Sequence, residues 1–270
     1  MIVIQIPDGK KVYCISDMHL GFPNASESRA REAQLVSWMD QIAHDASDLF
    51  LVGDLFDFWF EYREVVPKGF VRFLGKLASL ADSGVRIHVF VGNHDLWMKD
   101  YFVTECNAQI YQTLTDFEFQ FVHHSSRVCI GHGDGIGPGD YGYKLLKQVF
   151  TNPIAQFLFG FLHPDIGVRL AHFWSGTRKK STISSGEVMF NSDTDYIVLA
   201  IKDRMLTDRL ANKGIEAYVC GHRHHPVCIQ LASDIHYYNL GDWFSQDFKH
   251  AYVLQIGAKG FDFVKFQPNY

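Results

Sequence analysis

Apolar positions in the first hundred residues fall into short runs separated by longer helical patterns. Three runs rich in β-branched and aromatic residues predict buried strands. They are Val12–Ser16, Leu49–Val52 and Arg86–Val91. Between them, apolar residues recur at helical spacing over Ala30–Ala46, preceded by Ser26 and Ser28 as N-cap candidates, and over Lys68–Asp82. This βαβαβ order predicts parallel strands with ligand groups at their carboxyl ends.

The pattern changes in the middle of the chain and then returns to strands. Phe117–Val122 and Arg127–Gly131 predict two antiparallel strands. A helix over Tyr196–Lys213, a strand over Ala217–Cys220 and further strands through Lys265 continue the sequence. Together these elements predict an α/β fold.

Residues 135–204 predict a helical lid insertion within a single domain of residues 1–270. The segment begins with the glycine- and proline-rich loop Gly135–Gly139 and continues with apolar helical stretches. The most apolar stretch, Val149–Leu162, contains Asn152-Pro153 and is shorter than the roughly 20 apolar residues that a membrane span needs. From residue 144 to residue 181, six basic residues stand against one acidic residue, so the insertion carries a local positive charge.

Composition narrows the class of protein. A chain of 270 residues with 47% hydrophobic content can bury a sizeable core. The net charge of -5 provides no general positive field, so we expect no nucleic-acid partner. The five cysteines are scattered, which indicates reduced thiols in a cytoplasmic protein. The first ten residues lack the basic and apolar regions of a signal peptide, so we expect no export.

Polar residues with metal-binding side chains follow five of the predicted strands. The motifs are Ser16-Asp17-Met18-His19, Gly53-Asp54-Leu55-Phe56-Asp57, Gly92-Asn93-His94-Asp95, Gly131-His132-Gly133-Asp134 and Gly221-His222-Arg223-His224. Carboxylate oxygen, amide oxygen and imidazole nitrogen bind divalent ions, and a carboxylate can bridge two of them. With 14 histidines and 30 acidic residues, one such motif could arise by chance. Five in order predict a two-metal cluster.

These motifs resemble the calcineurin-like metallophosphoesterase superfamily, whose pattern is D-x-H, G-D-x-x-D, G-N-H-D/E, G-H and G-H-x-H. The resemblance spans essentially the whole chain and implies two mixed β-sheets packed face to face with flanking helices, a four-layer sandwich. It also implies two four-ligand metal sites that share Asp54. The first comprises Asp17, His19, Asp54 and His224, and the second comprises Asp54, Asn93, His132 and His222.

The resemblance also implies a mechanism. Two divalent ions lower the pKa of a bridging water, so a hydroxide can attack phosphorus near neutral pH. His94 with Asp95 is similar to the catalytic dyad of the family, and Asp57 and Asp134 are predicted to orient ligating groups, with a cap or turn role as the alternative for both. We expect Mn²⁺, although Fe, Zn²⁺ and Mg²⁺ suit the same ligand set.

Three longer segments resemble the UDP-2,3-diacylglucosamine hydrolase family, which forms lipid X and UMP in bacterial lipid A synthesis. They are Gly53–Trp59, Gly221–Pro226 and Asn239–Trp243. The resemblance implies a helical lid that holds acyl chains. Phe150, Ile154, Phe157, Leu158, Phe159, Phe161 and Leu162 would supply its apolar surface, although they could equally pack the insertion onto the core. The implied substrate-binding residues are Asp140, Tyr143, Arg178, Lys179 and Lys180.

One departure leaves the substrate open: His94 stands where that family has an arginine that grips the substrate phosphate. A phosphodiesterase or phosphatase of other specificity is therefore an alternative, and a non-catalytic metal-binding scaffold is a second one. An apolar and basic lid suits a nucleotide-linked lipid substrate and an anionic bilayer. We therefore expect a cytoplasmic enzyme with peripheral contact to the inner face of the membrane.

Overall fold

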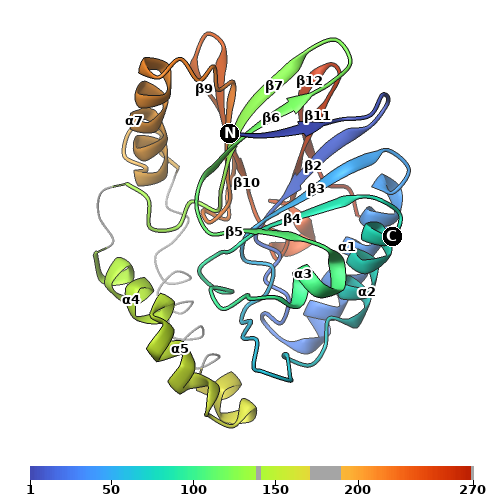
Figure 1. The fold of residues 1–270 in the computed structure, drawn as a ribbon, viewed down its shortest axis with the longest axis vertical. Coiled ribbons are helices and arrows are strands. Elements are labelled where there is room, and N and C mark those ends of the chain that lie inside the picture. The colour runs from blue at the N-terminus through green and yellow to red at the C-terminus, as the bar shows by residue number, and fades with distance from the viewer. Residues whose placement is uncertain (138–140, 171–189, 269–270) are drawn as a thin grey trace.

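The strands form two six-stranded sheets that pack face to face (Figure 1). The computed structural model describes residues 1–137, 141–170 and 190–268. Both sheets contribute to the core between them, with Phe50 and Val52 from one sheet and Phe117 and Val219 from the other. Each sheet contains parallel and antiparallel pairs, so the predicted α/β fold with two mixed sheets is confirmed.

The first sheet has the order β12-β11-β2-β3-β4-β5. Its strands are β2 (Lys11–Ile15), β3 (Ala46–Val52), β4 (Arg86–Phe90), β5 (Gln109–Tyr111), β11 (Tyr252–Gly257) and β12 (Gly260–Lys265). Strands β2 to β5 are parallel, as the βαβαβ pattern predicts. All seven residues of β3 are buried because helices cover one face and the other sheet covers the second.

The second sheet has the order β1-β6-β7-β8-β10-β9. Its strands are β1 (Ile2–Gln5), β6 (Thr115–Gln120), β7 (Ser125–Ile130), β8 (Ala217–Cys220), β9 (Pro226–Ala232) and β10 (Ile235–Leu240). β6 and β7 are antiparallel, as predicted, and β8 has the predicted bounds. β7, β8 and β10 are mutually parallel, so their carboxyl ends reach the same edge.

Helices cover the outer face of each sheet and complete four layers. On the first sheet lie α1 (Ala25–Ile42), α2 (Val71–Asp82) and α3 (Tyr101–Cys106), and on the second lies α7 (Tyr196–Leu210). A short 3₁₀ helix, η1 (Gln246–Phe248), follows β10. α7 buries Ile197 and Ile201 against Tyr218 and Cys220 of β8. The four-layer sandwich is therefore confirmed.

The predicted helix boundaries are less accurate than the predicted strands. α1 begins at Ala25 rather than Ala30, because the Asn24 side chain accepts hydrogen bonds from the backbone N–H groups of Ser26 and Glu27. It ends at Ile42, since Ala46 already belongs to β3. The predicted N-cap role of Ser28 is wrong: this residue is buried, and its hydroxyl accepts from Gly21 N at 2.7 Å.

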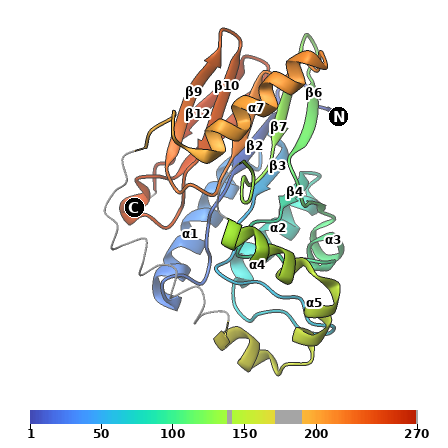
Figure 2. The ribbon, with the colours of Figure 1, turned by 90° about the vertical axis from the view of Figure 1, so that its left-hand side faces the viewer.

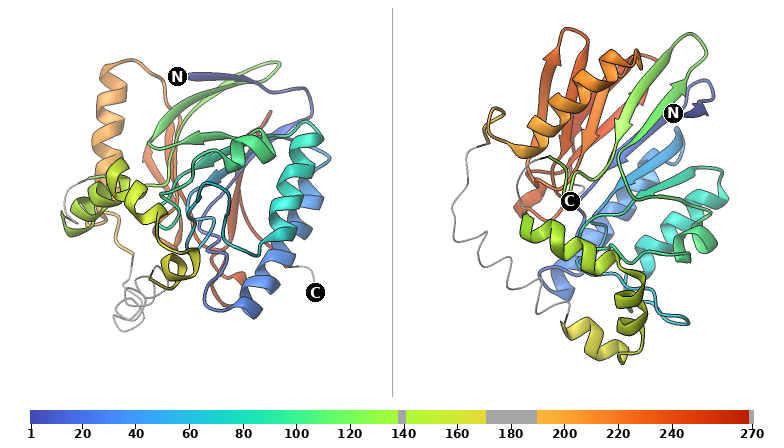
Figure 3. Two further views of the ribbon diagram at one scale, coloured as in Figure 1. Left: turned by 60° about the horizontal axis from the view of Figure 1, so that its bottom comes forward. Right: turned by 60° about the vertical axis from the view of Figure 1, so that its left-hand side comes forward.

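The helices α4 (Tyr141–Thr151) and α5 (Pro153–Gly160) lie outside the sheets, as Figure 2 and Figure 3 show. They contact the body through Trp97, whose indole N–H donates to Phe150 O at 2.6 Å and whose ring lies 4.7 Å from that of Phe159. Their placement agrees with helices in an insertion, while its bounds, 135–204, stay a prediction. Among the described residues, no helix combines the length and apolarity needed to cross a membrane.

Candidate metal centre

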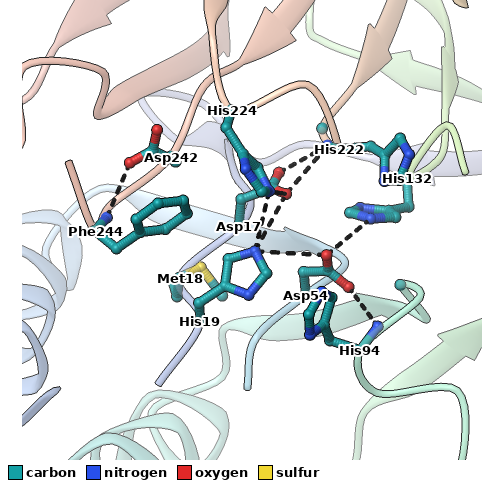
Figure 4. A network of polar contacts seen from close by, with 12 residues as sticks. Asp17, Met18, His19, Asp54, His94, His132, His222, His224, Asp242 and Phe244 are labelled. Atoms are coloured by element: carbon teal, nitrogen blue, oxygen red, sulfur yellow. Dashed lines mark hydrogen bonds and ion pairs between the residues drawn. The ribbon is translucent and has the colours of Figure 1, made fainter. Parts of the chain in front are cut away.

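The predicted ligands lie together where parallel strands of both sheets end. Asp17 follows β2, Asp54 follows β3 and Asn93 follows β4 in the first sheet. His132 follows β7 and His222 follows β8 in the second. Figure 4 shows the carboxylates and imidazoles pointing toward one another from these loops. Packing the sheets face to face brings the two sets of strand ends to one place, as open α/β sheets do at their carboxyl edges.

Asp54 lies at the centre of the cluster. Its Oδ2 is 3.5 Å from His19 Nε2 and 3.4 Å from His132 Nε2. Two groups of potential ligand atoms, each spanning less than 4.8 Å, share this carboxylate. One group is Asp17, His19, Asp54 and His224, and the other is Asp54, His132 and His222. The first group is the first set that the family resemblance implies, and the second contains three of the four ligands implied for the second set, without Asn93.

Several ligand atoms in the cluster are buried and have no hydrogen-bond partner among the described residues. Asp54 Oδ2, Asn93 Oδ1 and His132 Nε2 are all in this condition. Leaving a buried polar atom unpaired costs about 1–3 kcal/mol, so proteins rarely keep three of them together unless a ligand satisfies them. A pair of divalent cations fits this donor set of carboxylate, amide and imidazole.

Five of the predicted ligands have a left-handed backbone, which residues other than glycine seldom adopt. They are Asp17, His19, Asp54, His222 and His224, with φ between 43° and 70°. Each such residue costs about 1–3 kcal/mol and persists where the surroundings hold it. The glycines before the ligands allow close approach: a Cβ on Gly92 would overlap the Asp54 carboxylate, and one on Gly221 would overlap Asp17. The backbone therefore concentrates strain at the cluster.

The charges of the cluster suit cation binding. Burial lowers the pKa of His19 and of His222 to about 4, so both imidazoles are neutral near pH 7. Burial would also lower the pKa of His132, but the Asp54 carboxylate outweighs burial and holds that pKa well above its usual value. The same attraction holds the pKa of Asp54 well below its usual value, against the effect of burial. A metal cation can replace the proton that His132 and Asp54 attract.

The contacts described for His94 are with Asp57 rather than with Asp95, the predicted acid of the dyad. His94 Nδ1 is 2.9 Å from Asp57 O and 3.7 Å from Asp57 Oδ1, so Asp57 is the acid beside it. Asp95 is fully buried, and its carboxylate accepts from Leu55 N and Gly92 N, both at 2.7 Å. Asp95 therefore holds the loops after β3 and β4 together. Burial and the Asp54 charge raise its pKa to about 7.

Asp57 and Asp134, predicted to orient ligands, have different partners. Asp57 Oδ1 is 3.9 Å from His19 Nδ1, a position from which it can orient that imidazole. Asp134 accepts from Lys147 Nζ of α4 at 2.5 Å. The Lys147–Asp134 contact therefore connects the loop that carries His132 to α4.

The substrate-binding predictions fall largely where the structure gives no description. Asp140, Arg178, Lys179 and Lys180 lie outside the described residues. Tyr143 belongs to α4, but its side chain is not described. Their roles stay predictions.

The sequence interpretation missed three residues that support the cluster. The Phe244 ring packs edge-to-face against His19 at 5.1 Å and His224 at 4.9 Å. Asp242 accepts from Phe244 N at 3.0 Å, and the motif Asn239–Trp243 contained a signal for it. Arg31 is buried in α1 and donates to His19 O at 2.8 Å. An arginine inside a helical pattern gave no signal for that role.

The fold and the cluster define a metal-dependent hydrolase. A family model described as calcineurin-like phosphoesterase matches residues 10–226, and the chain belongs to this family. A UDP-2,3-diacylglucosamine hydrolase of Porphyromonas gingivalis (strain ATCC BAA-308 / W83) is 33% identical over 86% of this chain and 90% of its own length. A UDP-2,3-diacylglucosamine hydrolase of Histophilus somni (strain 129Pt) is 27% identical over 94% of this chain and 100% of its own length.

Proposed function

We propose that the chain hydrolyses UDP-2,3-diacylglucosamine at its pyrophosphate, releasing UMP and the lipid 1-phosphate. The observation that carries this proposal is an exposed apolar surface on the helices beside the metal centre. The names of the two relatives above agree with it. A substrate with two acyl chains and a pyrophosphate needs both an apolar surface and a cationic centre.

The apolar surface lies on α4 and α5, with further residues just after α5. Its exposed members are Leu145, Val149, Ile154, Phe157, Leu158 and Phe161, each at least half exposed. The helices join the site loops through Trp97, which lies two residues after Asp95, and through the Lys147–Asp134 ion pair. Acyl chains on this surface would therefore have their head group near the cluster.

The residues that would hold the two metals are the seven predicted ligands. Two cations there, which we propose to be Mn²⁺, would lower the pKa of a water molecule and neutralise charge on the phosphoryl oxygens. His94 is oriented through Nδ1 by Asp57, so proton donation to the leaving oxygen falls to its Nε2. Asp95 acts on the backbone of the two loops rather than on the proton of His94.

The same surface supports peripheral contact with the cytoplasmic face of the inner membrane, where a diacylated substrate would reside. Exposed Phe157 and Phe161 could enter the interface between head groups and acyl chains. Lys144 of α4 adds a positive charge that favours an anionic surface.

The test measures UMP release from UDP-2,3-diacylglucosamine by the purified chain with Mn²⁺. We expect release that falls strongly for a UDP-sugar without acyl chains, and loss of activity and of bound metal in Asp54→Ala. Equal turnover of both substrates would remove the lipid assignment and favour a phosphodiesterase of other specificity. If neither substrate nor a chromogenic phosphodiester reacts with any divalent metal, the chain is a metal-binding scaffold instead.

A further inference from the structure

Arg223 stands between two of the histidines in the cluster and forms an ion pair with Asp195. Its guanidinium donates to Asp195 Oδ2 from Nε at 2.6 Å and also from Nη2. The guanidinium carbon lies 4.8 Å from the centre of the Tyr196 ring, so the group is held by a carboxylate and by an aromatic face. The Asp195 side chain is only 2% exposed, against 36% for Arg223. This contact joins the loop after β8 to the start of α7.

The two oxygens of Asp195 have different partners. Oδ1 caps α7 by accepting from the N–H groups of Ile197 at 2.9 Å and Val198 at 3.1 Å. Because α7 is anchored to the second sheet by buried Ile197 and Ile201, the carboxylate has a fixed position. Its other oxygen, Oδ2, is therefore a rigid acceptor for Arg223.

The loop that carries the histidines needs such support. His222 and His224 both have a left-handed backbone, with φ of 70° and 54°. The first half of the loop is held through backbone groups: His222 N donates to Asp17 Oδ2 at 2.9 Å, and Asn239 Nδ2 donates to Gly221 O at 2.6 Å. The second half is held through side chains: Arg223 pairs with Asp195, and His224 Nε2 lies 3.2 Å from Asp17 Oδ1.

The Arg223–Asp195 ion pair also affects the charge near the metal centre. Arg223 adds a positive charge within one residue of two ligands that would hold divalent cations, and like charges there oppose metal binding. The Asp195 carboxylate compensates this charge and holds the guanidinium at the start of α7.

We propose that Asp195 is a positioning residue for the metal centre: by holding Arg223, it keeps His222 and His224 in the orientation that binds metal. This inference rests on the proposed function, in which both histidines are metal ligands. It assigns a role to an aspartate outside all five sequence motifs.

The test compares Asp195→Asn with the unaltered chain by calorimetric titration of Mn²⁺ into the metal-free protein. Asparagine retains an oxygen to cap α7 but loses the charge that holds Arg223. We expect Mn²⁺ affinity to fall about 10-fold, the lower end of the loss found for direct partners of metal ligands, because Asp195 acts through Arg223. Turnover of a chromogenic phosphodiester should recover at saturating Mn²⁺, and circular dichroism of the metal-free variant should be unchanged.

A second variant and a control separate this role from general destabilisation. Arg223→Gln should also weaken Mn²⁺ binding, but by less than Asp195→Asn because it removes the opposing charge as well, and the double variant should be no weaker than Asp195→Asn. Because Arg223 is partly exposed, this variant carries the test even if Asp195→Asn does not fold. Asp193→Asn removes an exposed charge that pairs with Lys202 nearby, and should bind Mn²⁺ normally.

The outcomes distinguish this inference from the proposed function. If the unaltered chain binds Mn²⁺ and both Asp195→Asn and Arg223→Gln bind it equally well, the positioning role is overturned while the proposed function stands. If the unaltered chain binds no divalent metal, the proposed function fails and this inference fails with it.

Discussion

The helices α1 and α5 differ in how their composition relates to their burial. α1 is largely polar in sequence, yet it buries Leu35, Trp38 and Met39 against the first sheet. α5 has the apolar sequence Pro153–Gly160, yet none of its residues is buried. Composition therefore does not decide burial; the position of a helix relative to the sheets does. An apolar helix left exposed beside a metal cluster indicates a surface for an apolar ligand.

The largest expected effect concerns the metal cluster in the buried body of the protein. Asp54→Ala removes the carboxylate shared by both ligand groups and should reduce hydrolysis by more than about 100-fold, beyond the loss expected for a residue that only supports a ligand. Bound metal, measured by elemental analysis, should fall as well. Normal metal content with normal activity would show that the cluster is not the active centre.

The next largest effect concerns the exposed helix α5. Phe157→Ser removes an aromatic ring that is 66% exposed, so the free energy of unfolding should hardly change. If acyl chains cover this ring, losing about 1.5–3 kcal/mol of burial should raise KM for the diacylated substrate roughly 10- to 100-fold. Val103→Ser, which changes an exposed residue of α3, serves as the control. An unchanged KM in Phe157→Ser would refute this surface as the acyl site.

A third prediction concerns the stability of the body through Asp48. This carboxylate is fully buried, and Arg86 donates to it twice at 2.7 Å. Burial opposes its ionisation, but the bonds from Arg86 and His88 outweigh burial and lower its pKa. Asp48→Asn should cost about 1–3 kcal/mol in the free energy of unfolding at pH 7, measured with urea.

The sign of the pH dependence follows from the lowered pKa. Because the folded state holds the Asp48 proton less tightly than the unfolded state, the stabilisation is present above the unfolded value of 3.8 and disappears as pH falls through the folded pKa. The difference in stability between the unaltered chain and Asp48→Asn should therefore shrink under acid. A difference that grows under acid would contradict this assignment.

The smallest effect concerns the ion pair that connects α4 to the buried body of the protein. Lys147→Gln breaks the ion pair between α4 and Asp134 and should raise KM for the diacylated substrate a few-fold, which corresponds to less than about 1 kcal/mol for a partly exposed pair. Turnover of a small chromogenic phosphodiester should not change. An equal loss with both substrates would place Lys147 in the chemistry rather than in holding α4.

Local signals predicted the strands and ligands better than the helix ends and side-chain partners. β8 was predicted to the residue, and the motifs after the strands gathered as expected, because strand period and terminal glycines are local properties. His94 and Asp95 are adjacent in sequence, yet Asp95 bonds the backbone of Leu55 and Gly92 while His94 faces Asp57. Adjacent side chains diverge, so adjacency was a poor guide to pairing.

By itself, the sequence predicted the parallel βαβαβ strands and the five motifs, because each depends on residue type at a short, regular spacing. The two mixed sheets and the two ligand sets followed from the family resemblance that these motifs carry. Tertiary structure alone decided which acid accompanies His94 and that α5 stays exposed. It also decided that Asp195, 28 residues before Arg223, lies within hydrogen-bond distance of it. Such contacts depend on how sheets and helices pack, and the separation of residues along the chain carries no information about that.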